Sequence, residues 1–230
     1  PGSALARLGS GILGRDVESG RDVPQPKLKG CTACRLREIT REPAKYGLHA
    51  TLKAPFYLAP GYCENDLLEK AEEFAARHCA IVIGRLRLKS LGSFIAAVPD
   101  TQCPGVEEQR RKLNALADDA LAFFDPLRLE ATPEELAKRS SRSLSPRQSD
   151  YLRQWGYPYV LEDYLFHVTL TGRLRHREDT RNVKRILTEH MEEALLQPLQ
   201  ARSLCICGQE VTAEGGRNFQ VLQRLYFAAS

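Results

Sequence analysis

The pattern His-x-Thr-Leu occurs twice in this sequence, and the repeat limits the folds that the chain can adopt. The first copy spans residues 49–52 and the second spans residues 167–170, so the copies lie 118 residues apart (167 − 49). Around each copy, the spacing of apolar residues predicts the same order of elements: a strand with the motif, a helix, and two further strands. This repeated order indicates two similar lobes that hold their motif strands in equivalent positions.

The expected elements follow from apolar periodicity, which repeats about every 3.6 residues in a helix and every two in a strand. The expected helices cover residues 4–15, 65–79, 104–124 and 178–197, with one more short helix before residue 45. Asn65 is expected to cap the second of these. The expected strands cover residues 48–54, 81–91, 93–99, 164–172, 203–211 and 219–228. Residues 126–150 give the weakest pattern, and within them the stretch KRSSRSLSPRQ, residues 138–148, is polar, basic and rich in Ser, which is typical of a linker or exposed loop.

These elements predict an α+β fold made of two pseudo-symmetric lobes. Each lobe is an antiparallel sheet with helices on its outer face, and a central groove between the lobes holds the site. The lobes cover approximately residues 1–125 and 150–230, with elements that can be exchanged between them. We expect the whole chain, residues 1–230, to form a single two-lobed domain.

Composition favours a protein of the cytoplasm and excludes a helical membrane span. Hydrophobic residues make up 43% of the 230 residues, and no apolar run approaches the ~18 residues that span a bilayer. No secretory leader opens the chain, although it does not begin with Met. The seven cysteines are odd in number and irregularly spaced, which favours reduced thiols. The net charge of +4 (33 − 29) suits an anionic ligand without requiring a nucleic acid.

The motif residues are of the types that acid–base chemistry at a phosphate requires. In a strand, residues i and i+2 share a face, so His49 points with Thr51, and His167 points with Thr169. Imidazole titrates near pH 6.5, so one His can accept a proton while the other donates one. Threonine hydroxyls can donate to the phosphate oxygens, where negative charge gathers. Together they suit phosphodiester chemistry without a metal or a cofactor.

Several motifs and stretches of the sequence resemble those of a known family. The paired motifs and the repeated element order are similar to the two-histidine phosphoesterase superfamily. The stretches YGLHATLKAPF, LGSFIAAVPD and SPRQSDYLRQWGYPYVLEDYLFHVTLTGR resemble a bacterial branch of it whose genes lie beside carbon–phosphorus lyase genes. The resemblance runs from about residue 3 to the end, and it implies that His49 and His167 are the catalytic pair and that Thr51 and Thr169 hold the phosphate. Members of the branch usually have one further strand before the segment PGSALARLGS.

Three more residues are candidates for substrate binding, each with a structural alternative. Lys53 and Arg173 flank the motifs and carry charges that could hold a phosphate, although Arg173 could equally be solvated. Tyr46 could line the pocket or simply pack against the core. We expect no metal; the weak alternative is a four-thiolate zinc site formed by Cys31, Cys34, Cys205 and Cys207.

The sequence therefore predicts a metal-independent, cofactor-free hydrolase that opens a small cyclic phosphodiester, of a nucleotide or a sugar, and the resemblance implies a role in phosphonate breakdown. The alternatives are a non-catalytic module that binds RNA or a nucleotide, and an enzyme that ligates or processes RNA ends. The expected partner is a small phosphorylated substrate, with RNA as a second possibility, no membrane, and a monomeric chain. The identity of the substrate, the ester bond that breaks, and which His is the acid remain open at this point.

Overall fold

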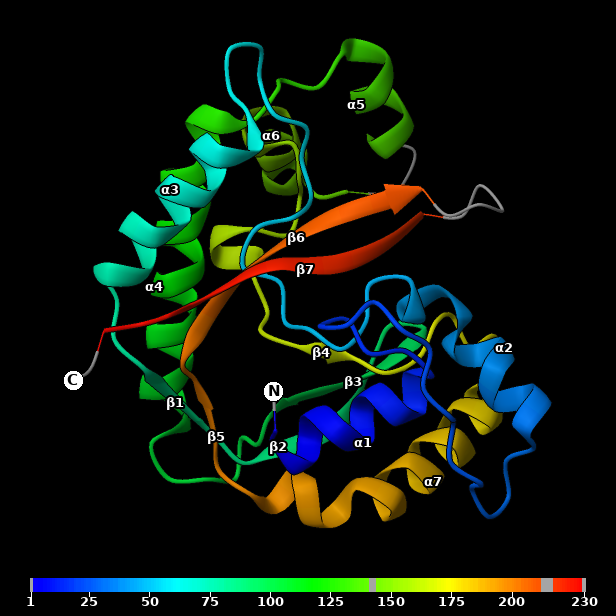
Figure 1. Cartoon of the computed structure of the whole chain (residues 1–230). Coiled ribbons are helices and arrows are strands. Elements are labelled where there is room, and N and C mark those ends of the chain that lie inside the picture. The colour runs from blue at the N-terminus through cyan, green and yellow to red at the C-terminus, as the bar shows by residue number, and fades with distance from the viewer. Residues whose placement is uncertain (1, 141–143, 212–216, 229–230) are drawn as a thin grey trace.

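The computed structural model describes residues 2–140, 144–211 and 217–228, which form an α+β fold (Figure 1). The helices are α1 (Ala4–Leu13), α2 (Ala33–Ala44), α3 (Glu64–Ala76), α4 (Val106–Phe124), α5 (Pro133–Ser140), α6 (Pro146–Trp155) and α7 (Arg177–Leu196), with short 3-10 turns η1 (Asp125–Leu127) and η2 (Leu161–Asp163). The strands are β1 (Ile81–Gly84), β2 (Leu86–Leu91), β3 (Phe94–Pro99), β4 (Val168–Thr169), β5 (Leu199–Ala201), β6 (Ser203–Val211) and β7 (Arg217–Tyr226).

The described strands form three antiparallel sheets, in the orders β1-β5, β2-β3-β4 and β6-β7. Two of these sheets join strands from opposite halves of the chain. Val168 in β4 pairs with Ala97 in β3, and Ala201 in β5 pairs with Ile81 in β1. Strands are thus exchanged between the halves, and the symmetry of two lobes stays a prediction.

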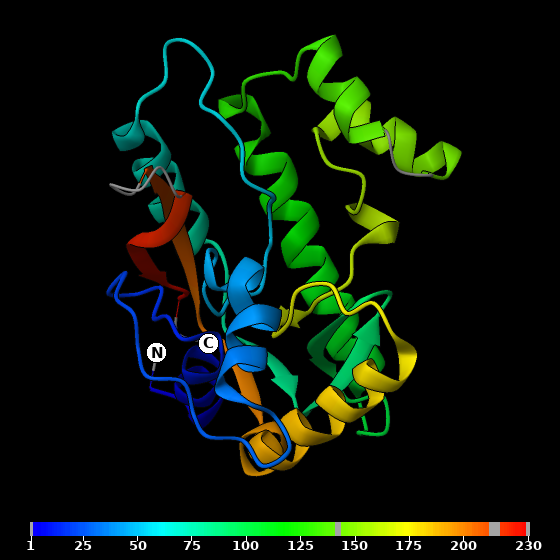
Figure 2. The same ribbon diagram turned by 90° about the vertical axis from the view of Figure 1, so that its right-hand side faces the viewer.

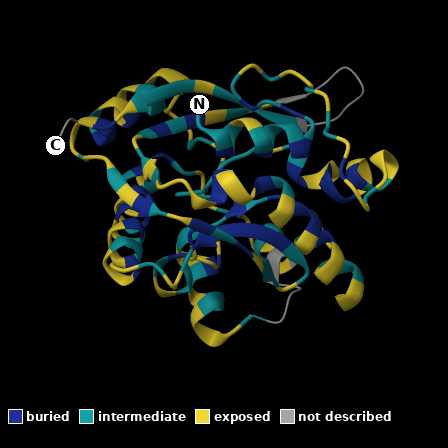
Figure 3. Cartoon of the chain, turned by 90° about the horizontal axis from the view of Figure 1, so that it is seen from below, coloured by how far each residue is buried: buried dark blue, intermediate teal, exposed yellow. Residues whose placement is uncertain are grey.

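Two hydrophobic clusters hold the sheets to their helices. In the first, α1, α2 and α7 cover the β2-β3-β4 sheet, and Leu36, Ile95, Leu187 and Met191 are buried between them. In the second, α3 and α4 pack near β6 and β7, with Phe74 at the centre. Burying one such apolar side chain contributes about 1.5–3 kcal/mol to the stability of the folded state. Figure 3 shows the result: buried residues lie along the strands and inner helix faces, and exposed residues lie outside.

The expected long helices are confirmed to within a few residues, because their apolar stripes face these clusters. The inward residues of α7 are Val183, Ile186, Leu187, Met191 and Leu195, as its periodicity predicts. The expected strand at 81–91 is split, since Gly84 has a φ of +81° and the chain turns there from β1 into β2, which belong to different sheets. Such a φ is easily adopted only by glycine.

Two sequence expectations about helices are wrong. The expected linker at residues 138–148 is partly helical, because α5 ends within it at Ser140 and α6 begins within it at Pro146, at the end of the molecule far from α1 and α7 (Figures 1 and 2). The signals for α6 are the Ser145 cap, which accepts from the amide of Gln148, and Pro146 in the first turn. Asn65 does not cap α3, which begins one residue earlier; the Asp66 carboxylate instead accepts from the amide of Cys63 at 2.7 Å. Part of the expected loop, residues 141–143, lies outside the described residues.

None of the helices in the described ranges combines the length and the apolar character that a membrane crossing requires.

Candidate functional site

The two His-x-Thr motifs lie side by side as neighbouring antiparallel segments. A single β-bridge joins Ala50 to Val168, and β4 holds the second motif against β3. In this register His49 stands opposite Thr169, and Thr51 stands opposite His167. Because neighbouring residues in an extended segment alternate in direction, all four polar side chains share the face opposite to Ala50 and Val168. The structure thus brings the four expected residues together on one surface.

The expected motif strands are much shorter than their alternation predicts. The first motif contributes only the bridge at Ala50, and the second contributes only the two residues of β4. The sequence reasoning placed the motif strands opposite each other across a groove, and the observed arrangement is instead one ladder. The four groups therefore approach a ligand from the same side.

His49 is half-buried and held in one tautomer. Its Nδ1 lies 2.9 Å from the carbonyl oxygen of Gly47, which can only accept, so Nδ1 carries a proton. Its Nε2 lies 3.1 Å from the hydroxyl of Thr51. Burial lowers the pKa of His49, while the bond to Gly47 raises it and the nearby charge of His167 lowers it further. A neutral His49 with a free electron pair on Nε2 is suited to accept a proton.

His167 repeats the arrangement of His49. Its Nδ1 lies 2.8 Å from the carbonyl oxygen of Leu165, again two residues before the histidine. Its ring lies 5.9 Å from that of Phe94 at the start of β3. The Nε2 atom makes no hydrogen bond among the residues that the structure describes, which leaves it free to reach a ligand. The two histidines are therefore held in position through the same nitrogen, Nδ1.

Two residues that the sequence reasoning missed hold the first motif in place. Gly47 has a φ of +67°, and a Cβ there would lie 2.4 Å from that of Val17, so only glycine fits. The Tyr164 hydroxyl donates to the carbonyl oxygen of Thr51 at 3.0 Å, and burial raises the pKa of Tyr164, which keeps the phenol protonated as a donor. A Gly and a Tyr just before the two motifs were the available signals, but neither reveals a partner far along the chain.

The structure does not bring Lys53 to the His/Thr face. Its ammonium group donates to the carbonyl oxygen of Leu121 and to Asp125, each at 3.0 Å, and its side chain is 8% exposed. Burial lowers the pKa of Lys53, and the bonds to Asp125 oppose this. Arg128 holds the same carboxylate at 2.7 Å. These contacts describe an internal ion pair that joins the first motif to the end of α4.

Tyr46 and Arg173 lie beside the motif residues. Tyr46 stacks on Phe219, with ring centroids 5.1 Å apart and planes at 17°, and its ring lies 6.1 Å from that of His49. Arg173 is exposed, four residues after Thr169. A large open groove of about 1900 Å³ is lined by Tyr46, His49, Thr51, Thr169 and Arg173 among others.

The zinc alternative is not supported by the described residues. All seven cysteines are free thiols, and the described ranges contain no group of three or more His, Cys, Asp or Glu side chains arranged to hold a metal ion. Burial raises the pKa of Cys205, and that of Cys207 to about 11, so these two thiols stay protonated at neutral pH.

Comparison with known proteins gives a family and two curated relatives. A family model described as "Protein of unknown function (DUF1045)" matches residues 51–220. A protein named "Ribose 1,5-bisphosphate phosphokinase PhnN" from Janthinobacterium sp. (strain Marseille) is 36% identical over 229 residues, which cover 98% of this chain and 48% of that protein. A protein of the same name from Laribacter hongkongensis (strain HLHK9) is 34% identical over 206 residues, 90% of this chain and 46% of that protein. The chain spans about half the length of these relatives.

These names overturn the prediction of a cyclic phosphodiesterase. A phosphokinase is a transferase that moves a phosphoryl group onto an acceptor, whereas the sequence reasoning expected a hydrolase that opens a diester. The physical reason for the error is that paired imidazoles and hydroxyls suit several reactions at phosphorus. The residue types indicate a phosphate ester but do not select the bond that changes.

The aligned chain has no P-loop of the kind that many kinases use for a nucleotide. That motif reads G-x-x-x-x-G-K-[ST] and lies between a strand and a helix. Gly9 and Gly14 have its glycine spacing, but Arg15 and Asp16 follow them. Gly9 lies inside α1 and Gly14 ends that helix, so this stretch does not form a phosphate-binding loop.

Proposed function

This chain belongs to the DUF1045 family of proteins of unknown function, and we propose that it binds a phosphorylated ribose and transfers protons at one of its phosphate groups. The observation that carries the proposal is the pairing of Ala50 with Val168, which puts two imidazoles and two hydroxyls on one face. The name of the two curated relatives supplies the ligand class, a ribose bisphosphate, and the reaction class, phosphoryl transfer.

The hydrogen bonds of the four motif side chains assign each of them a different role at the phosphate. His49 accepts the proton of the ligand's attacking oxygen as that oxygen bonds the transferred phosphorus and the bond from this phosphorus to the donor breaks, because burial lowers the pKa of His49 and leaves its Nε2 unprotonated. His167 presents its Nε2, which makes no hydrogen bond among the described residues, to a phosphate oxygen on the same side of the ligand. The hydroxyls of Thr51 and Thr169 donate to the remaining oxygens, where charge gathers in the transition state.

The proposal is limited to the sugar-phosphate side of the reaction. The chain aligns with about half of each phosphokinase and has no P-loop, so the phosphoryl donor is not assigned to any of its residues. Descent from the two-histidine phosphoesterase superfamily, the symmetry of two lobes and a role in phosphonate breakdown belong to the proposal as well. The resemblance of the motifs supports them.

Calorimetric titration with ribose 1,5-bisphosphate, ribose 5-phosphate and ribose tests the binding step. We expect both phosphorylated ligands to bind and ribose to bind much more weakly. His49→Ala and Thr169→Val should each weaken the phosphorylated ligands by about tenfold or more, because one lost hydrogen bond to a charged group is worth about 1.5–3 kcal/mol. His190→Ala, in α7 and outside the groove lining, is the matched control. Equal affinity for ribose and its phosphates would contradict the proposal.

The proton-transfer step needs its own readout. Phosphorus NMR can follow phosphoryl transfer to the ribose phosphate when the donor and any partner that supplies it are present. With saturating ligand, His49→Ala and His167→Ala should each lower the rate by about 10²–10⁴-fold. His190→Ala should leave the rate unchanged. A site that only binds would show the affinity losses and no separate loss of rate.

A further inference from the structure

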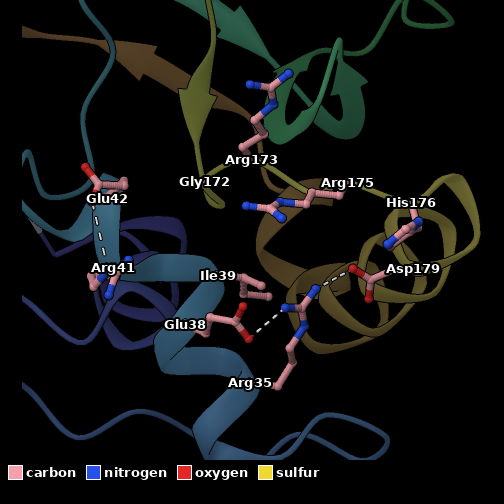
Figure 4. Close-up of a pocket in the computed structure, with 10 residues that line it drawn as sticks. All are labelled: Arg35, Glu38, Ile39, Arg41, Glu42, Gly172, Arg173, Arg175, His176 and Asp179. Carbon is pink, nitrogen blue, oxygen red and sulfur yellow. Dashed lines mark hydrogen bonds and ion pairs between the residues drawn. The ribbon is translucent and has the colours of Figure 1, made fainter.

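A second pocket lies beside the His/Thr face, between α2 and the start of α7 (Figure 4). Its volume is about 500 Å³, and four arginines line it beside three carboxylates: Arg35, Arg41, Arg173 and Arg175, with Glu38, Glu42 and Asp179. Arg173 also lines the large groove, so the two spaces adjoin at this residue.

The pocket exists because the segment after β4 docks on the middle of α2. Pro43 has no amide hydrogen, so the carbonyl oxygen of Ile39, four residues earlier, lacks its helical donor. The amide of Gly172 donates to this oxygen at 2.6 Å. A Cβ at Gly172 would lie 3.3 Å from the same oxygen, so glycine permits the approach. This contact places the residues that follow, Arg173 to His176, along the pocket between α2 and α7.

The acidic residues of the pocket already have partners. Arg35 donates to Glu38 at 2.8 Å and also pairs with Asp179 in the first turn of α7. Glu42 accepts from Lys45 at 2.9 Å. The guanidinium of Arg35 is therefore used in holding α2 to α7, and the carboxylates have little capacity left to neutralise another cation.

Arg173 and Arg175, in contrast, make no ion pair or side-chain hydrogen bond among the residues that the structure describes, and both are exposed. Figure 4 shows the Arg175 side chain reaching into the space between α2 and α7, while Arg173 points the other way, toward the sheet. His176 is the N-cap of α7 and makes no side-chain capping bond, so the free amides of the first turn add a partial positive charge near Arg175, which Glu178 and Asp179 in that turn partly offset.

We propose that this pocket holds a second phosphate group of the ligand whose first phosphate lies over the His/Thr face. This rests on the proposed binding of a phosphorylated ribose. Arg175 binds the second phosphate, because a planar guanidinium can donate two parallel hydrogen bonds to its oxygens. Arg173 stands between the two phosphates. Arg173 lines both the pocket and the groove that also contains Thr169, so one ligand can extend from one space into the other past this residue. The site therefore selects a sugar with two phosphates over a sugar with one.

The test is the ratio of affinities for ribose 1,5-bisphosphate and ribose 5-phosphate. The unaltered protein should favour the bisphosphate by at least about tenfold. Arg175→Gln should remove most of this preference and leave the affinity for the monophosphate unchanged. Arg177→Gln removes the same charge two residues along the chain, outside the pocket lining, and should leave the ratio as it is. Both side chains are exposed, so neither change should alter the melting temperature.

The outcomes separate this inference from the proposed function. If His49→Ala weakens the monophosphate but Arg175→Gln leaves the ratio unchanged, the second subsite is wrong and the proposed function stands. If no ribose phosphate binds at all, the proposed function fails. Binding of pyrophosphate then decides the pocket: loss of that binding in Arg175→Gln but not in Arg177→Gln supports an anion site, and equal binding by both variants overturns it.

Discussion

The Nε2 atom of His49 lies 3.1 Å from the hydroxyl oxygen of Thr51, two residues along the same extended segment. The opposite nitrogen of the ring is fixed by the carbonyl of Gly47, so the tautomer leaves Nε2 as the acceptor. Thr51 thus points its proton at His49 when the site is empty and can turn it to a phosphate oxygen when a ligand arrives. Protonation of Nε2 would remove this acceptor.

Protonation of His49 should destabilise the folded protein. Burial lowers the pKa of His49 in the folded state, so the unfolded chain binds its proton more tightly. The stability that the neutral ring contributes is complete above the unfolded pKa, about 6.5, and is lost as the pH falls from there through the lowered folded value. Urea unfolding at pH 7.5 and 5.0 should show a smaller loss in His49→Gln than in the unaltered protein. An identical loss in both would contradict the prediction.

Tyr164→Phe should lower the free energy of unfolding by about 1 kcal/mol, because it removes a hydrogen bond from a partly buried acceptor. The lost bond joins the Tyr164 hydroxyl to the carbonyl of Thr51. Tyr57→Phe is the matched control, because Tyr57 is 64% exposed. Chemical denaturation measures both changes. If Tyr164→Phe behaves like Tyr57→Phe, this bond does not hold the first motif.

Lys53→Met should destabilise the fold by about 1–3 kcal/mol and leave ribose phosphate affinity unchanged. Its ammonium group bonds Asp125 and the carbonyl of Leu121, and removing it leaves a half-buried carboxylate with Arg128 alone. Lys89→Met, an exposed position on β2, is the control for stability. Calorimetric titration of the folded variant gives the affinity. A tenfold loss there would restore Lys53 to the role that the sequence suggested.

Periodicity predicted the elements that bury a stripe and missed those that depend on distant partners. The helix α7 matches the spacing of its apolar residues, because that spacing places them all on the face that packs against the core. The first motif alternates like a strand, yet it pairs only at Ala50, since a ladder requires a neighbour and alternation does not say how long that neighbour runs.

The candidate site shows the same division. The shared face of His49 and Thr51 follows from local geometry, so the sequence was enough to expect it. The ion pair of Lys53 joins residues that are 72 positions apart, which no local pattern reveals. The reaction class was missed for a chemical reason, because the same donors and acceptors serve several reactions at phosphorus.

Gly172→Ala tests whether the docking of the second motif on α2 supports the ligand site. The new Cβ would lie 3.3 Å from the carbonyl oxygen of Ile39, tighter than nine in ten Cβ contacts in proteins, and the 2.6 Å hydrogen bond from the Gly172 amide would lengthen. We expect a loss of about 1 kcal/mol of stability. Affinity for the bisphosphate should fall more than that for the monophosphate, because the shift moves Arg173 and Arg175 relative to α2.

The matched control, Gly11→Ala, is expected to change stability in the opposite direction. Gly11 lies in the interior of α1, and a Cβ there would meet nothing within 4 Å. Gly11→Ala should therefore stabilise the protein by about 0.5–1 kcal/mol through helix propensity, with both ligand affinities unchanged. Denaturation curves and titrations of the two variants check the pair. If Gly172→Ala matches Gly11→Ala in both measurements, then the contact between Gly172 and Ile39 does not position the arginines.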